Sequence, residues 1–305
     1  MSSTDPEELA GIIRPARGDL VITGKGTFIA KAIQIDMPQL WMQHVEEELP
    51  RIWHNAAPDS RGAIWFYTQP GPAAAFQGAD VTTNQIGICP VAHPIWQMLT
   101  GPSSWGSMSL PLDTWSDLSI VAGSDPFTGR TGTILSPDDA DVTRLQRLHH
   151  STVRLTQNAP ELLANADVAR GIEQSLIHAM ALCFQSVGQR DFSCSAWNRS
   201  RVMRNFKEFL EASGDTPVYV TDLCAKLGIA ERTLRKICQE YIGIGPKKYL
   251  YLRRMHLARR ALRAGDPAAT SVTDVATRFG FWELGRFSVA YKDLFGEMPS
   301  TTLRQ

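Results

Sequence analysis

A helix-turn-helix pattern occurs twice in the last third of the chain, and it constrains the fold more than any other feature. In the first unit, a short helix at 220–227 is followed by a turn at Gly228 and a second amphipathic helix at 231–241. In the second unit, a helix at 272–279 is followed by Gly280 and a longer helix at 282–295. Two such units in tandem predict an all-helical domain that can contact two neighbouring turns of DNA.

The second helix of the first unit has one apolar and one polar face. Leu234, Ile237, Cys238 and Tyr241 share the predicted buried face. The opposite face carries four side chains that can bind base edges: Arg232, Arg235, Lys236 and Gln239. Arginine can bind the two acceptors of guanine, and glutamine those of adenine. The alternative is a solvated basic face without a partner.

The second unit offers fewer donors to DNA. Its outward residues are Glu283, Gly285, Arg286 and Val289, so we expect this unit to read fewer bases.

One basic helix, predicted at 246–263, joins the two units. Its 18 residues span about 27 Å, slightly less than the roughly 34 Å between successive major-groove faces. The cations that we expect near phosphates are Lys247, Lys248, Arg253 and Arg254. A solvated basic linker is the alternative.

The same residues resemble the AraC/XylS family of bacterial regulators. The resemblance covers about a third of the chain and is carried by residues 254–262, 272–276, 280–281, 286–288, 291–292 and 295–299. A softer resemblance, over 280–287, is to regulators of ethanolamine utilisation. The family resemblance implies base contacts by Arg232, Arg235 and Lys236 in the first unit and by Gly285, Arg286 and Val289 in the second. Two positions depart from the family: Ala230 lacks the usual capping hydroxyl, and Val289 stands where a polar group is common, although valine can contact a thymine methyl.

Charge is distributed unevenly along a chain of zero formal net charge. Residues 201–305 contain 18 Lys or Arg and 11 Asp or Glu, whereas residues 1–200 contain 13 and 20. The basic part should therefore bind phosphates, and the acidic part should face away from DNA. The five cysteines have no metal-ligand spacing and indicate reduced thiols. No secretion signal or membrane span is recognisable, so we expect a cytoplasmic protein with no membrane partner.

Residues 16–135 read as short strands separated by turns. The strands are predicted at 27–35, 40–45, 63–68, 85–91, 106–110 and 118–121. The pattern favours an antiparallel barrel or sandwich, and the family resemblance implies a cupin-like sensory domain. The overall fold class is therefore α+β multidomain.

The predicted sensory region contains no constellation typical of a metal enzyme. His44, His54 and His93 stand apart, so we expect no metal and no other cofactor. Aromatic residues cluster in the strands, and Trp41, Trp65 and Trp96 are the candidates for an effector pocket. Simple core packing is the alternative for them.

Helical patterns between 136 and 187 carry apolar stripes that suit either pairing with a second copy or packing on the strands. Ser136 and Pro137 form the predicted helix start. Residues 1–15 are expected to be a disordered tail, 188–195 a linker, and 196–305 the DNA-binding domain.

Together these features predict a transcription factor, not an enzyme, that binds double-stranded DNA. The expected partners are RNA polymerase, an unknown small-molecule effector and a second copy of the chain, and activation is the expected effect. The alternatives are a cupin-type metal enzyme fused to a DNA-binding domain and a regulator without a small-molecule effector.

Overall fold

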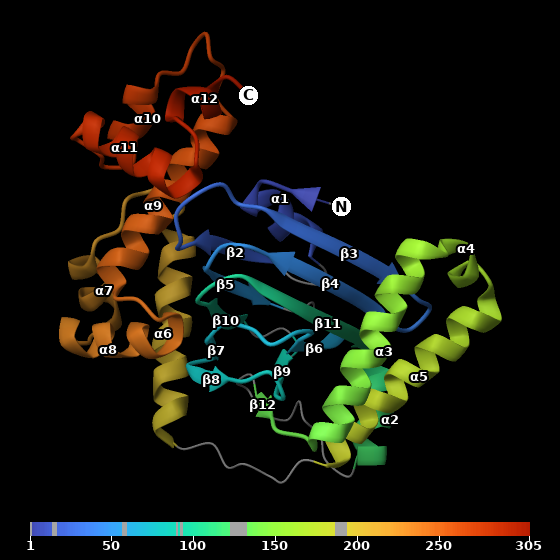
Figure 1. Ribbon diagram of the computed structural model, residues 1–305. Helices are drawn as coiled ribbons and strands as arrows, with labels where there is room; N and C mark the ends of the chain where they lie inside the picture. The colour runs from blue at the N-terminus through green and yellow to red at the C-terminus, as the bar shows by residue number, and fades with distance from the viewer. Residues whose placement is uncertain are drawn as a thin grey trace.

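The protein is a β-sandwich with helices on both sides, as the computed structural model in Figure 1 shows. The structure describes residues 2–13, 17–56, 60–89, 91, 94–122, 133–186 and 194–305. The amino-terminal part is built from antiparallel strands, and the carboxy-terminal part is helical. The expected fold class is confirmed.

The sandwich consists of two sheets whose described strand pairs are all antiparallel. The seven-stranded sheet has the order β1 (Ser2–Ser3), β3 (Ala30–Asp36), β4 (Trp41–Glu47), β11 (Ser103–Pro111), β6 (Arg61–Tyr67), β9 (Ile86–Cys89) and β12 (Thr133–Leu135). The five-stranded sheet has the order β2 (Arg17–Ile22), β5 (Arg51–Ala56), β10 (Pro94–Leu99), β7 (Ala74–Phe76) and β8 (Ala79–Val81).

Three layers of apolar contact hold these parts together. Large aromatic side chains fill the space between the sheets, with Trp53 and Trp105 in contact at 5.9 Å between ring centroids. The outer face of the seven-stranded sheet packs under helices α2 (Leu112–Ala122), α3 (Asp139–Asn158) and α5 (Ala166–Gln185). The short helix α4 (Pro160–Leu163) joins α3 to α5. The apolar stripes of α3 and α5 are thus used inside the chain, through buried residues such as Val142 and Met180.

The helical carboxy-terminal part covers the outer face of the five-stranded sheet. It contains α6 (Cys194–Ala212), α7 (Val220–Leu227), α8 (Glu231–Ile242), α9 (Pro246–Arg263), α10 (Val272–Arg278), α11 (Leu284–Phe295) and α12 (Pro299–Leu303). Val21, Ile52 and Trp96 of the sheet belong to the same buried cluster as the core of these helices. The two parts therefore share one hydrophobic core.

Two predictions about secondary structure are wrong. The expected strand at 118–121 belongs to helix α2, because Trp115 and Leu118 lie three residues apart and both face the core under α5. The expected disordered tail contains β1 and helix α1 (Pro6–Ile12), whose start is capped by the Asp5 carboxylate accepting from the Glu7 N–H at 3.0 Å.

Helix α3 starts at Asp139, and its N-cap is Asp138 instead of the expected Ser136. The Ser136 hydroxyl accepts a hydrogen bond from Gln85 instead. Most of the expected linker at 188–195 lies outside the described residues, and α6 begins within it at Cys194.

Candidate nucleic-acid interface

The first unit has the predicted helix-turn-helix geometry. Helix α7 ends at Gly228, which has a φ of 64° and therefore makes the turn in a left-handed conformation that favours glycine. Helix α8 follows and buries Leu234, Ile237, Cys238 and Tyr241, the residues predicted to face inward. The N-cap residue of α8 is Ala230, the position where the family usually has a capping hydroxyl.

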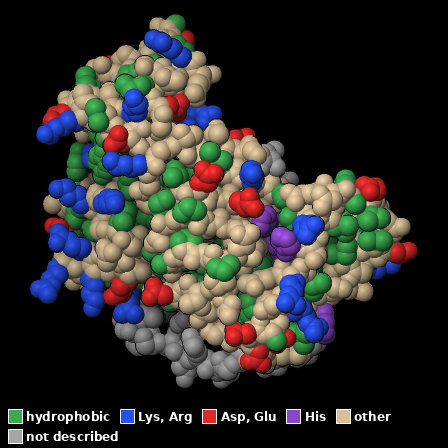
Figure 2. All heavy atoms as spheres, viewed as in Figure 1, with side chains coloured by type: hydrophobic (Ala, Val, Ile, Leu, Met, Phe, Trp, Pro, Cys, Tyr) green, Lys and Arg blue, Asp and Glu red, His purple; other side chains and the backbone are tan. Residues whose placement is uncertain are grey.

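The polar face of α8 is open. Arg232, Arg235, Lys236 and Gln239 are all exposed. Arg235 donates to Glu231 at 2.7 Å, and Gln239 donates to the Gly243 carbonyl at 2.7 Å. Both contacts are at the surface and cost little to exchange for a base edge. Figure 2 shows Lys and Arg side chains gathered along the left edge, over the region of α6 to α8.

The second unit repeats this geometry with different side chains. The Ser271 hydroxyl caps α10 by accepting from the Asp274 N–H at 3.0 Å, and Gly280 makes the turn with a φ of 76°. Helix α11 begins at Leu284, two residues later than expected. Gly285, Arg286 and Val289 are exposed on it.

The four cations predicted near phosphates have different surroundings. Lys247 and Lys248, in the first turn of α9, are exposed and available. Arg253 instead donates to the Leu210 and Gly214 carbonyls at 3.0 and 2.7 Å, and so stabilises the carboxyl end of α6. The structure thus gives Arg253 a role inside the protein that the sequence did not indicate.

Arg254 lies between the two units. Its guanidinium stacks on the Tyr219 ring at 5.4 Å, at the start of α7, and on the Phe281 ring at 5.2 Å, after α10. A Cβ atom on Gly280 would lie 3.0 Å from its Nη1 atom, so the glycine leaves room for this side chain. Arg254 therefore joins the first unit to the second.

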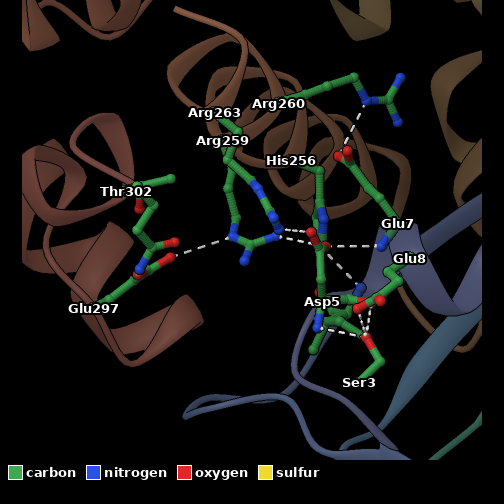
Figure 3. A network of polar contacts seen from close by, with 12 residues as sticks. Ser3, Asp5, Glu7, Glu8, His256, Arg259, Arg260, Arg263, Glu297 and Thr302 are labelled. Atoms are coloured by element: carbon green, nitrogen blue, oxygen red, sulfur yellow. Dashed lines mark hydrogen bonds and ion pairs between the residues drawn. The ribbon is translucent and has the colours of Figure 1, made fainter. Parts of the chain in front are cut away.

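The far end of α9 is held by the amino terminus of the chain, as Figure 3 shows. Asp5 pairs with Arg259 at 2.9 Å and also with Arg263, while Glu7 pairs with Arg260 at 3.1 Å. Arg259 also faces Glu297, at 3.6 Å. We call Asp5, Glu7, Arg259, Arg260 and Arg263 the amino-terminal clamp. The amino-terminal carboxylates therefore neutralise three arginines of α9, which a solvated or phosphate-binding helix would leave unpaired.

The sheet face under α6 and α9 carries further polar contacts. The Lys207 ammonium, nearly buried, pairs with Asp19 of β2. The Ile22 N–H donates to His256 Nε2 at 3.0 Å, and burial lowers the pKa of this histidine to about 4. His256 is therefore a neutral acceptor between the two parts at neutral pH.

Both units contact the sandwich directly. Asp293 of α11 pairs with Lys25 at 2.8 Å, and its carbonyl accepts from the Gly26 N–H at 2.9 Å. At the other unit, the Tyr241 ring lies against Gly78, where an added Cβ would approach it to 2.6 Å. The sandwich therefore fixes the position of each unit relative to the other.

The three candidate pocket tryptophans lie in different environments. Trp65 is buried between the sheets. Trp41 is partly exposed and stacks under Arg61 at 3.9 Å. Trp96 faces away from the sandwich interior, packing on Phe206 and Tyr249 at 6.0 and 5.7 Å. Trp96 therefore belongs to the contact between the two parts, which corrects its expected place in a pocket wall.

A cavity of about 290 Å³ opens at one end of the strands, and none of these tryptophans lines it. Its wall includes Lys31, Glu46, Glu47, Glu48 and Ser103. Glu47 is buried and bridges to the sandwich interior, accepting from Arg51 at 2.9 Å and from the Trp105 N–H at 2.7 Å.

Two of the three histidines considered as metal ligands, His44 and His54, are buried. Burial lowers the pKa of His54 to about 3 and also lowers the pKa of His44, whereas His93 lies outside the described residues. Burial raises the pKa of the Cys238 thiol to about 12. Within the described part of the chain, no three His, Cys, Asp or Glu side chains are grouped to hold a metal ion. No described helix has the length and apolar composition needed to cross a membrane.

Comparison with known proteins identifies relatives of the carboxy-terminal part. A family model described as a helix-turn-helix domain matches residues 223–305. The probable thc operon regulatory protein of Rhodococcus erythropolis is 37% identical over 103 residues, which are 34% of this chain and 31% of that protein. The XylDLEGF operon transcriptional activator of Pseudomonas putida is 34% identical over 100 residues, 32% of this chain and 30% of that protein. The match thus spans about a third of the length of these relatives.

Two solved structures are also similar. A probable AraC family transcriptional regulator from Rhodopseudomonas palustris CGA009 is 35% identical, with 34% of this chain and 95% of that chain covered and a TM-score of 0.31. The AraC-like transcriptional activator CuxR is 14% identical, with 81% and 85% covered and a TM-score of 0.42. By its motifs, the family model that it matches and its identity to the two operon regulators, the carboxy-terminal third of the chain is a helix-turn-helix domain of the AraC/XylS family.

Proposed function

We propose that the protein regulates transcription by binding a specific DNA sequence with both helix-turn-helix units. The observation that carries this proposal is the shared helix α9, which joins two units whose second helices leave their outward faces uncovered. Lys247 and Lys248 at its start supply charge for phosphates. The named relatives are operon regulators and activators, which favours activation through RNA polymerase in the cytoplasm.

The amino-terminal part is proposed to respond to a small effector that carries hydrogen-bond acceptors. Between the two sheets, the indole N–H groups of Trp53 and Trp65, the Arg51 Nη2 atom and the Gln97 amide nitrogen are buried, and no described residue accepts from them. A buried donor without an acceptor costs about 1–3 kcal/mol, so a ligand oxygen placed there would be stabilised. A carboxylate or carbonyl oxygen is the kind of acceptor that any one of these donors would bind.

The shared core explains how such a response would reach DNA. Both units contact the sandwich, through Asp293 in the second and Tyr241 in the first. A ligand that favours one packing of the sheets would therefore favour one spacing of the two units. Pairing with a second copy remains a prediction, and the exposed Leu162 and Val168 near α4 are its candidate contacts.

Selection from random DNA duplexes tests the function. The wild-type protein should enrich one motif, and Arg235→Ala should relax the preference at one position and cost about 1 to 3 kcal/mol. Arg170→Ala is the matched control, because Arg170 is an exposed, ion-paired arginine on α5, away from both units. A wild-type protein that enriched no motif would contradict the proposal.

Two measurements separate the alternatives. Stoichiometric metal in the purified protein would favour a metal enzyme, whereas a regulator should contain none. Thermal-shift screening of carboxylic acids, amides and amines should find a stabilising compound. A screen in which no compound raises the melting temperature would favour a regulator without a small-molecule effector.

A further inference from the structure

Helices α8 and α11 correspond residue by residue. Each has 12 residues, each is followed by a glycine in the left-handed conformation, and each buries its fourth, eighth, eleventh and twelfth residues. In this register Arg232 corresponds to Gly285, Arg235 to Ser288, and Lys236 to Val289. At these three positions the first unit has long cationic side chains. The second unit has instead a glycine, a serine hydroxyl and a short apolar side chain.

The apolar groups near α11 are the most exposed large hydrophobic side chains of the described chain. Trp282, just before the helix, is 74% exposed, and Val289 is 64% exposed. Large apolar side chains exposed to this extent at a recognition helix and its start favour a surface that a partner covers, because only burial would stabilise them. Arg286 stands beside them and is held by Glu283 at 2.9 Å.

Gly285 has no role in packing within the protein. A Cβ atom added to it would meet nothing within 4 Å, and its φ is outside the positive range. Glycine in a helix is generally less stable than alanine. A glycine with no internal cause, on the outward face of a recognition helix, fits a site where another molecule approaches the backbone closely.

We propose that the second unit reads DNA by close apolar contact, with Val289 and Trp282 packing on thymine methyl groups and Gly285 allowing α11 to lie deep in the major groove. The thymine methyl is the apolar group that a base pair presents in the major groove, and apolar side chains bind it. The first unit then reads bases by charge and hydrogen bonds, and the second by apolar contact with thymine methyl groups beside the predicted contact of Arg286. This inference rests on the proposed function.

Replacement of thymine by uracil tests the methyl contact, because it removes only the methyl group. In the duplex selected by the wild-type protein, uracil at one or two positions should weaken binding about fourfold. The Val289→Ala variant should lose this discrimination at the position that Val289 contacts and keep it at the position that Trp282 contacts. If the wild-type protein binds every uracil duplex as tightly as its thymine parent, the inference is wrong, while a selected motif would still support the proposed function.

The glycine is tested with a matched pair of substitutions. Gly285→Ala and Gly171→Ala both add a methyl group to a helical glycine with open space around it, and Gly171 lies on α5 away from the two units. Neither should lower the melting temperature. Only Gly285→Ala should weaken binding to the selected duplex, by about tenfold or more. If the two variants bound DNA equally well, the proposal that Gly285 lets α11 lie deep in the major groove would be wrong.

A protein partner is the competing occupant of this surface. Trp282→Ala should weaken binding to the selected duplex and leave binding to a scrambled duplex unchanged. If instead it bound the selected duplex normally but lost activation with purified RNA polymerase, the surface would be a protein contact and the inference would fail.

Discussion

His256 shows how one residue can make the contact between the two parts depend on pH. It is buried, its Nε2 atom accepts from the Ile22 N–H, and the rings of His256 and Phe295 are 5.1 Å apart. A proton on Nε2 would remove this acceptor. Because burial lowers the pKa of His256 to about 4 from its ordinary 6.5, the unfolded chain takes up a proton before the folded chain does.

The free energy of unfolding should therefore be fully maintained above about pH 6.5 and should fall as the pH falls toward about 4. His256→Gln keeps an acceptor without a titrating ring. Urea unfolding at about pH 7 and pH 5 should show that the wild-type protein loses on the order of 2 kcal/mol more than this variant. The control is His150→Gln, at an exposed position of α3. Equal pH dependence of wild type and His256→Gln would contradict the assignment.

Helix α9 has a different environment in its first turn, its middle and its last turns. Its first turn exposes Lys247 and Lys248, its middle places Arg254 between the two units, and its last turns enter the amino-terminal clamp. A pattern of cations in the sequence predicts the helix but not these assignments. Arg253, Arg254 and Arg259 have similar sequence surroundings, and only tertiary packing gives each of them its partner.

Lys248→Ala and Arg254→Ala should both weaken binding to all DNA sequences, but for different reasons. Lys248→Ala should reduce the slope of log affinity against log salt by about 1 and leave the melting temperature unchanged. Arg254→Ala should lower the melting temperature, because it removes the stacking that joins Tyr219 to Phe281. Fluorescence anisotropy at several salt concentrations and thermal unfolding separate the two. An unchanged salt slope for Lys248→Ala would contradict a phosphate contact.

At the scale of the whole molecule, the sequence predicts the fold of each part better than it predicts how the two parts pack together. Glycine turns and helical periodicity place both units correctly, because those signals are local. The sequence does not indicate strand β5, since the strand is buried on both faces and Arg51 to Asn55 show no alternation. Its outer face is buried only because the helical part covers it. The expectation of a disordered tail also overlooks helix α1, although Asp5-Pro6-Glu7-Glu8 combines a capping residue, a proline and two carboxylates, as residues 136–139 do.

Release of the amino-terminal clamp should change DNA binding by the whole molecule. Glu7→Gln frees the half-exposed Arg260, so affinity for a scrambled duplex should rise and its salt dependence should become steeper. Asp5→Asn should do the same and also lower the melting temperature, because Arg259 is left buried with less compensation. Asp167→Asn, which removes a surface partner of Arg170, is the control. Unchanged affinity of Glu7→Gln for scrambled DNA would contradict this role.

The common core of Val21, Ile52 and Trp96 with helices α6 and α9 also limits how the chain can be divided. A fragment that began at α6 would expose the hydrophobic surface that normally packs on the sheet. A fragment that ended before α6 would expose the matching hydrophobic surface of the sheet. Fragments truncated at this junction should therefore aggregate or self-associate. Fusing the helix-turn-helix domain to an unrelated sensory domain would require polar substitutions on that hydrophobic surface.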